Sequence, residues 1–391
     1  MKPWKEKKLV ALSYALVPLL SFLMLSSGTD NAYCEMLTVD ALNRPAMATD
    51  RAETSVLLAI DRTGPRLVVV GERGLILNSE DNGSTWRQVA VPVSVTLTGI
   101  EFADDDNGWT FGHSGIVLKT EDGGRSWKKQ LDGVQAAALA YQDAEDRLID
   151  ANEDEQTNDV LKRQLSFTRL LVDDGPDKPF LDMYCMNDRE AFIVGAYNMI
   201  FKTVDGGHTW LPWLNRVENP RGMHLYAIEK IDDKLIIVGE QGLILRSDDG
   251  GESFYQLHSP YDGTFFGILA LKNGAVLIYG LRGNAFISQD HGDHWQKIDT
   301  GVKLGITAAV ESPDGTLFFT TQSGNVLVSH DGGNTMKKQK IEAPFAFSDL
   351  LQTLSRKLVL VGMRGVKVVP PVSTQTGAVH RDSLIAYGDK K

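Results

Sequence analysis

Short apolar runs, each too short to make a buried helix, alternate along most of the chain with turns rich in glycine and aspartate. Residues 97–102, 108–112, 115–120 and 126–130 form one group of four strand-like segments. Units of this kind begin at residues 67, 108, 191, 235, 276, 317 and 358, and five of them have a Gly-x-x-Gly turn, while Asn198 and Thr321 each replace one glycine in the other two. Four short strands repeated about every 40 residues are typical of a propeller blade. We therefore predict an all-β fold, a seven-bladed β-propeller.

A second turn, present in every unit except the last, follows the pattern Ser/Thr-x-Asp-x-Gly-x-x-aromatic. It occupies residues 79–86, 120–127, 203–210, 247–254 and 288–295, and a weaker copy at 329–336 ends in methionine. A carboxylate at one turn of every blade lies too far from the others to act on one bond, so we predict a structural role in turn hydrogen bonds. The aspartates concerned are Asp81, Asp122, Asp205, Asp249, Asp290 and Asp331.

The interval from residue 108 to residue 191 is about twice the others, which indicates an insertion between blades two and three. Ala137, Tyr141, Ala144 and Leu148 follow a helical spacing, and a second such segment follows after a polar connection. We predict an inserted helical hairpin over residues 134–172. The stretch from Asp143 to Asp177 carries eleven acids and four bases, so it is strongly acidic.

The two ends of the chain differ from the repeats. Four lysines precede an apolar run at residues 9–25, which predicts that residues 1–33 are a signal peptide or membrane anchor and that the protein is periplasmic or otherwise extracytoplasmic. The propeller is expected over residues 34–370. The last unit lacks an Asp turn, and we expect residues 36–40 to supply its missing outer strand. Residues 371–391 are expected to be a disordered tail.

Charge and motifs narrow the classes of function. A net charge of −11 without a basic cluster argues against nucleic acid or an anionic membrane as a partner. Membrane association is expected only through a partner or an uncleaved signal. Two cysteines are too few for a disulfide scaffold, and they leave open whether Cys34 and Cys185 pair. No spacing suits a metal or cofactor site, and no catalytic motif is present, so we predict no cofactor.

Alternate turns of a four-stranded blade emerge on opposite faces, so the Gly-x-x-Gly turns, the blade-to-blade loops and the insertion are expected to share one face. Arginines and aromatics on such loops suit protein recognition. The alternative is that the aromatics plug the ring and the arginines are only solvated. The candidate partner-binding residues are Arg73, Arg282, Arg364, Tyr197, Arg216, Arg221, Phe265 and Phe266.

The Asp-containing turns resemble the Asp-box, or BNR, repeats of sialidases and related propellers. Residues 238–254, and more loosely 194–210, are more similar to the photosystem II stability/assembly factor family, and from about residue 55 to 369 the chain resembles its non-photosynthetic bacterial branch. The resemblance implies a non-enzymatic assembly factor, because the photosynthetic members are lumenal and bind partner proteins through an arginine patch. Arg73, Arg282 and Arg364 are the positions that we match to that patch.

The bacterial relatives are discussed alongside RND-type exporters, so the resemblance also implies an accessory role in the cell envelope. We therefore predict an exported, non-catalytic propeller that binds an envelope protein or membrane complex, with an RND-type transporter as one such partner. The alternatives are a sialidase-like glycoside hydrolase and a propeller that binds a glycan or lipid without turnover. The Arg-Ile-Pro landmark of sialidases is absent.

Overall fold

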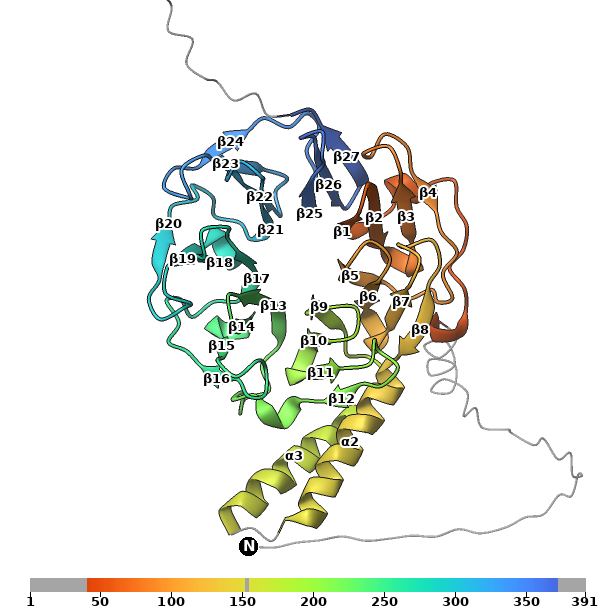
Figure 1. Cartoon of the computed structure of the whole chain (residues 1–391), viewed down its shortest axis with the longest axis vertical. Helices are drawn as coiled ribbons and strands as arrows, with labels where there is room; N and C mark the ends of the chain where they lie inside the picture. The colour runs from red at the N-terminus through yellow and green to blue at the C-terminus, as the bar shows by residue number, and fades with distance from the viewer. Residues whose placement is uncertain (1–40, 152–154, 372–391) are drawn as a thin grey trace, which may run out of the picture. The chain divides into compact units, whose positions relative to one another are not determined.

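The computed structural model describes residues 41–151 and 155–371. In this part of the chain the strands form seven separate antiparallel sheets, six with four strands and one with three. The sheets stand around one axis as the blades of a propeller, with the first strand of each nearest the axis (Figure 1). The predicted seven-bladed propeller is confirmed.

The blades follow the order of the sequence. Blade one contains β1 (Leu57–Thr63), β2 (Arg66–Gly71), β3 (Ile76–Ser79) and β4 (Arg87–Gln88). Blade two contains β5 (Leu97–Phe102), β6 (Gly108–Gly112), β7 (Val117–Thr120) and β8 (Lys128–Leu131). Blade three contains β9 (Phe180–Cys185), β10 (Ala191–Gly195), β11 (Ile200–Thr203) and β12 (Leu211–Pro212). Blade four contains β13 (Leu225–Ile231), β14 (Lys234–Gly239), β15 (Ile244–Ser247) and β16 (Tyr255–Gln256).

The remaining blades repeat this arrangement, except for the last. Blade five contains β17 (Phe265–Ala270), β18 (Val276–Gly280), β19 (Ala285–Ser288) and β20 (Gln296–Ile298). Blade six contains β21 (Ile306–Glu311), β22 (Leu317–Thr321), β23 (Val326–Ser329) and β24 (Lys337–Gln339). Blade seven contains β25 (Phe347–Gln352), β26 (Leu358–Gly362) and β27 (Gly365–Val369), and no fourth strand within the described residues.

The Asp-containing turns are built by hydrogen bonds between neighbouring residues. In blade four the Ser253 amide and hydroxyl donate to the two oxygens of Asp249, at 3.0 and 2.6 Å, and the Gly251 amide donates to the Ser247 hydroxyl at 2.7 Å. These bonds, above all that from the Ser253 hydroxyl, lower the pKa of Asp249 to about 2. The carboxylate is thus committed to the turn, as the sequence predicts for all six aspartates.

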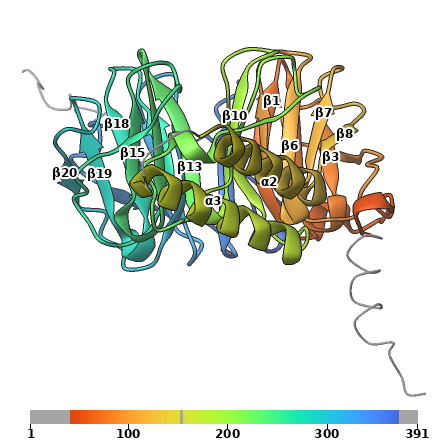
Figure 2. The ribbon, with the colours of Figure 1, turned by 90° about the horizontal axis from the view of Figure 1, so that it is seen from below.

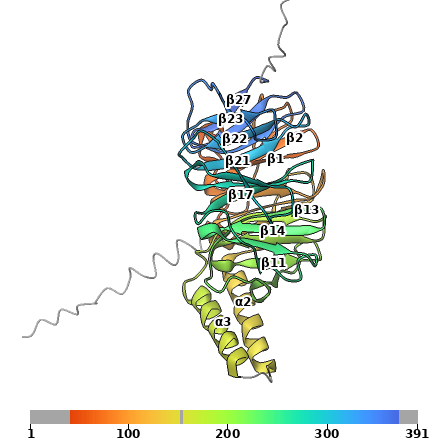
Figure 3. The same cartoon turned by 90° about the vertical axis from the view of Figure 1, so that its left-hand side faces the viewer.

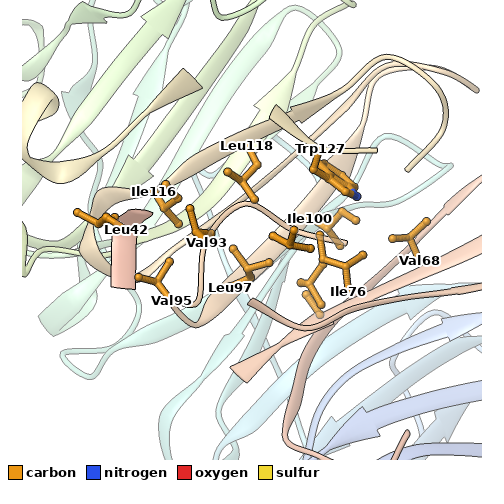
Figure 4. Packing of buried hydrophobic residues seen from close by; sticks show 13 residues of the cluster. Leu42, Val68, Ile76, Val93, Val95, Leu97, Ile100, Ile116, Leu118 and Trp127 are labelled. Carbon is orange, nitrogen blue, oxygen red and sulfur yellow. The ribbon is translucent and has the colours of Figure 1, made fainter. Parts of the chain in front are cut away.

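The core is divided into wedges between neighbouring blades. In the wedge between blades one and two, Trp127 from the Asp-containing turn of blade two packs with Val68 and Ile76 of blade one (Figure 4). Trp127 is 5% exposed, and burial of such a side chain stabilises the fold by about 3 kcal/mol. Each wedge therefore joins two blades through side chains rather than through a shared sheet.

The insertion forms two helices, α2 (Gly133–Asp150) and α3 (Glu155–Asp173), which lie side by side (Figure 2). Asp132 begins α2 with a capping box, in which its side chain accepts the Val134 and Gln135 amides and the Gln135 side chain accepts the Asp132 amide. Ala136 and Ala140 pack into the wedge of blades two and three, and the hairpin extends away from the blades (Figure 3). No helix among the described residues combines the length and apolar character needed to cross a membrane.

The ring closes where blade seven meets blade one. Strand β1 packs against β25, and a 3-10 turn, η1 (Ala52–Thr54), packs on the start of β27. Before η1 the chain runs along blade one, where the Gln88 side chain donates to the Met47 carbonyl at 2.9 Å. The expected outer strand at residues 36–40 lies outside the described residues. The same is true of Cys34, the predicted signal at 1–33 and nearly all of the predicted tail.

Candidate functional site

The propeller has two faces with different turns. On one face the Asp-containing turns lie against the turns between first and second strands, as shown by the Gly123 amide, which donates to the Asp106 carbonyl at 2.8 Å. On the other face lie the Gly-x-x-Gly turns, which connect the second and third strands of each blade and which we call the hairpin tips. They lie against blade-to-blade loops, since the Asn198 amide donates to the Met223 carbonyl at 3.2 Å. We call these the Asp-turn face and the Gly-turn face. This separation follows the sequence prediction.

The hairpin tips on the Gly-turn face hold side chains in a backbone conformation that normally favours glycine. Arg73 has φ 54°, Tyr197 55°, Gln241 52° and Arg282 59°, and all four side chains are exposed. A side chain in this left-handed region costs about 1 kcal/mol relative to glycine. Each tip glycine that follows is required for a second reason, because a Cβ on Gly74 would lie 2.2 Å from the Val93 carbonyl oxygen.

The three arginines matched to the patch all lie on the Gly-turn face and are exposed. Arg73 and Arg364 belong to neighbouring blades one and seven, whereas Arg282 is on blade five. Within the described chain, none of the three guanidinium groups forms a hydrogen bond or an ion pair. They are available to anionic groups of a partner, but they do not form one compact cluster.

A row of four aromatic rings crosses the Gly-turn face from blade three to blade five. The ring centroids of Tyr197 and His224 are 4.6 Å apart, those of His224 and Tyr226 6.3 Å, and those of Tyr226 and Phe266 5.8 Å. Tyr197 is 44% exposed, and the other three side chains are partly buried. We call these four residues the aromatic row.

Basic side chains flank the blade-three end of the aromatic row. The Lys178 ammonium lies 5.1 Å from the centroid of the Tyr197 ring and pairs with Asp174 at 3.0 Å, just after α3 ends. Ion pairs with Asp177 and Asp174 raise the pKa of Lys178 despite its burial, so the charge is retained. Arg221 donates to the Gln241 side chain at the next hairpin tip. The base of the helical hairpin is therefore continuous with the row.

Two of the predicted partner-binding residues lie elsewhere. Phe265 is 0% exposed and packs edge-on against Tyr261 and Phe286, so its ring belongs to the core. Arg216 lies beside the Asp-containing turn of blade four, pairs with Glu252 at 3.0 Å, and its guanidinium carbon lies 4.1 Å from the Trp213 ring centroid. Conversely, sequence reasoning missed His224 and Tyr226, whose only signal was their place at the start of an inner strand.

Five acidic residues lie on the first strands of five different blades, which are the strands nearest the ring axis (Figure 1). Three of them accept a backbone amide from the next blade: Asp349 from Ile60 at 2.9 Å, Asp61 from Phe102 at 2.9 Å, and Asp182 from Ile228 at 2.8 Å. These bonds satisfy edge amides of the first strands and tie neighbouring blades together. We call the five the inner acids: Asp61, Glu101, Asp182, Glu229 and Asp349.

Removal from water changes the titration of the inner acids. Burial raises the pKa of Asp61, Asp182 and Glu229 to about 7 and that of Asp349 to about 6, and it raises the pKa of Glu101 well above its usual range. Repulsion between these carboxylates adds to the effect in most of them. Near neutral pH the inner acids are thus partly protonated.

Two further kinds of site were considered in the described part of the chain, a metal site and a reactive thiol. In residues 41–151 and 155–371 no three His, Cys, Asp or Glu side chains gather closely enough to hold a metal ion. Cys185 is a free thiol that packs partly buried against the wedge of blades two and three. Burial raises the pKa of Cys185, which keeps the thiol protonated and unreactive.

The fold and the turn chemistry define the chain as a BNR, or Asp-box, β-propeller. The family model for the photosynthesis system II assembly factor YCF48 matches residues 78–156 and 170–302, together more than half of the chain. The chain therefore belongs to the YCF48 family of BNR propellers, as the sequence resemblance predicted.

Known relatives agree with this assignment. The photosystem II assembly lipoprotein Ycf48 of Synechococcus sp. (strain CC9902) is 24% identical over 160 residues, which are 40% of this chain and 48% of the relative. The chain thus matches about half the length of that relative. A solved structure of YCF48 bound to D1 peptide has a TM-score of 0.59 at 15% identity and covers 84% of this chain and 100% of that one.

The same fold also occurs in enzymes. The GH74 enzyme of Niastella koreensis has a TM-score of 0.58 at 11% identity, covering 81% of this chain and 52% of that one. At such identities the solved structures establish the fold alone.

Proposed function

We propose that this protein is a non-catalytic accessory factor that holds a partner polypeptide on its Gly-turn face. The observation that carries the proposal is the aromatic row, flanked by Lys178 and Arg221. Arg73, Arg282 and Arg364, whose guanidinium groups have no partner within the described chain, lie on the same face. Aromatic and arginine side chains dominate the binding energy of most protein interfaces. The YCF48 structure with a bound D1 peptide supports the same kind of role for a related fold.

The proposed setting is the cell envelope. The apolar run at residues 9–25 and the description of the Synechococcus relative as a lipoprotein support an extracytoplasmic location. The proposed partner is an envelope protein or a membrane complex, with an RND-type transporter as the first to be tested. A fusion of alkaline phosphatase after Pro371 should be active in intact cells, and an inactive fusion that is stable in the cytoplasm would refute this location.

Crosslinked recovery of partners from membranes tests the binding face. Three variants are compared with the intact protein: one lacking residues 134–172, one with Arg73, Arg282 and Arg364 replaced by Ala, and one with Tyr197 and Phe266 replaced by Ala. The matched control replaces three exposed arginines that lie toward the Asp-turn face, Arg62, Arg125 and Arg189, by Ala. We expect loss of the partner in the Gly-turn variants and not in the control. Equal recovery from all of them would place the partner surface elsewhere.

The inner acids support a second candidate, a glycoside hydrolase. Such enzymes use two carboxyl groups, one of them with a raised pKa, and Asp61, Glu101 and Glu229 have this property. A panel of sialosides and glucans should show no hydrolysis if the binding role is right. Hydrolysis that is lost in Glu101→Gln, with an unchanged melting temperature, would favour the enzyme instead.

A further inference from the structure

The wedge between blades five and six lacks an aromatic side chain that other wedges contain. The last residue of each Asp-containing turn packs between its own blade and the preceding one. In blades one to five this residue is aromatic: Trp86, Trp127, Trp210, Phe254 and Trp295. In blade six it is Met336, which is only partly buried beside its wedge. Because a thioether chain covers less area than an indole, the wedge is incompletely filled at this position.

The first-strand residue beside this position differs as well. In blade two, Phe102 at the end of β5 packs edge-on against Trp127, which Figure 4 shows in its wedge, with ring centroids 6.3 Å apart. Blades two and six have the same register between first and second strands, and it places Glu311, at the end of β21, at the position of Phe102. An aromatic pair in one wedge is thus replaced by a carboxylate and a thioether in the other.

A pocket of about 390 Å³ opens at this place on the Asp-turn face. Its apolar lining includes Leu271 and Leu317, which also belong to the core of the wedge between blades five and six. Gly332 of the Asp-containing turn lies at its exposed side, where a Cβ would meet no atom within 4 Å. The volume lies within the range of about 300–1,000 Å³ that is usual for ligand sites. The pocket therefore has an apolar floor and an entrance with room for an incoming chain.

One carboxylate oxygen is held in position at the side of this pocket. Glu311 Oε2 accepts the Lys272 amide at 2.8 Å, while the Lys272 ammonium donates to the Ser312 carbonyl at 2.7 Å. Glu311 Oε1 lies 3.9 Å from where a Cβ on Gly315, another lining residue, would stand, and it accepts no hydrogen bond from the described residues. The pocket thus offers one free acceptor beside two leucine side chains.

We propose that this pocket binds a tryptophan side chain of a partner polypeptide. Its indole ring packs on Leu271 and Leu317, and its N–H donates to Glu311 Oε1. Tryptophan fits best because its ring carries one donor and no acceptor, whereas phenylalanine would cover the carboxylate without giving it a partner. The bound indole takes the place that Trp127 takes in the wedge between blades one and two.

This site is separate from the proposed binding face. The aromatic row lies on the Gly-turn face, between blades three and five, whereas the pocket lies on the Asp-turn face, between blades five and six. The two surfaces therefore form independent contacts, and the loss of one leaves the other intact.

Titration of the full chain, labelled with ¹³C at the methionine methyl groups, tests the proposal. The probes are N-acetyltryptophanamide, its phenylalanine and leucine analogues, and free indole. We expect N-acetyltryptophanamide to shift the Met336 methyl resonance upfield through the ring current and to saturate. The phenylalanine analogue should bind about tenfold more weakly, because it lacks the donor to Glu311. Free indole should also bind more weakly, because it lacks the peptide groups at the entrance.

Two variants separate the parts of the site. Met336→Trp supplies the indole from the chain itself, so the melting temperature should rise by a few degrees and binding of the probe should be lost. Glu311→Gln should weaken binding roughly fivefold or more, because a neutral acceptor replaces a charged one. The matched control, Glu342→Gln, changes an exposed carboxylate outside the pocket and should leave binding unchanged.

Several results would overturn the proposal. They are an unshifted Met336 methyl resonance, equal binding of the three amides, and binding that survives Met336→Trp. A melting temperature that falls in Met336→Trp would show that the wedge is already full, which also contradicts the proposal. Free indole binding as tightly as N-acetyltryptophanamide would assign the pocket to a small molecule instead of a polypeptide.

Discussion

At Arg73, Tyr197, Gln241 and Arg282 the chain keeps a side chain where glycine would relax the backbone. The local cost at each tip is about 1 kcal/mol. The Arg73 and Arg282 side chains form no hydrogen bond or ion pair within the described chain that could offset it, whereas Tyr197 packs on His224 and Gln241 accepts a hydrogen bond from Arg221. A tip that only had to turn the chain would gain stability from glycine. The strain is therefore consistent with selection for what these side chains bind.

Arg282→Gly tests whether the Arg282 side chain serves partner binding at the expense of the stability of the fold. We expect the melting temperature to stay equal or rise by a few degrees, because φ 59° suits glycine, while recovery of the partner falls. Asn82→Gly, at φ 57° in an Asp-containing turn, is the matched control and should raise stability without affecting the partner. A fall in the melting temperature of Arg282→Gly would show that the side chain is structural.

The stability of the fold should fall both as the pH rises toward neutrality and as it falls toward 2. Asp61, Asp182 and Asp349 have folded pKa values of about 6 to 7, above their unfolded values near 4, so their protonated forms stabilise the fold at low pH and this stabilisation is lost as pH rises through 7. Aspartates such as Asp81 and Asp331, with pKa about 2, contribute in the opposite sense, and their stabilisation is lost as pH falls from 4 toward 2.

Thermal denaturation between pH 2 and pH 9 should therefore show a maximum near pH 4 to 5. Asp182→Asn keeps an acceptor for the Ile228 amide but does not titrate, so it should flatten the decline between pH 5 and 8. A melting temperature that is constant across that range in the wild-type protein would contradict the raised pKa values.

At the scale of elements, neighbouring blades are held together by side chains that reach from the third strand of one blade to the Asp-containing turn of the next. Asn78 donates to the Gly124 carbonyl at 2.8 Å, Lys119 to Gly206 at 2.9 Å, and Arg246 to His291 at 3.2 Å. The Lys119 ammonium also lies 4.7 Å from the centroid of the Trp109 ring. These contacts join neighbouring blades where no sheet connects them.

Lys119→Met should lower the free energy of unfolding by about 1–3 kcal/mol, because it removes the charged donor to the Gly206 carbonyl at a site where Lys119 is 6% exposed, and leaves that carbonyl only the Gln130 side-chain amide at 3.1 Å. The control is Lys128→Met on the adjacent strand, whose side chain is 77% exposed and pairs only with Glu121. Urea denaturation should separate the two variants. Equal stabilities would mean that the ammonium contributes no net stabilisation.

The sequence predicted the blades and faces because both follow from local constraints. A tip glycine such as Gly74 is required by a close carbonyl, and the Asp-containing turn is closed by its own residues, so both recur with the repeat. The aromatic row does not recur. It depends on which residues of different blades meet in space, so Phe265 and Phe266 were not separable by sequence although one is buried and the other is not. Arg216 was misplaced because its loop turns back onto blade four.

At the scale of the whole molecule, seven similar wedges close a ring whose last contact is between β1 and β25. That contact includes the bond from the Ile60 amide to Asp349, one of the inner acids. Nearby, β27 pairs only with β26 among the described residues, so blade seven has three strands there.

The helical hairpin occurs once, whereas the blades occur seven times. A partner that recognised only the β-hairpin tips of the blades could bind in seven nearly equivalent orientations around the ring axis. An α2 helix of 18 residues extends about 27 Å, far enough to distinguish one orientation from the rest. The helical hairpin can therefore select the single rotational orientation in which a partner docks on the propeller, even if it contributes little to the affinity.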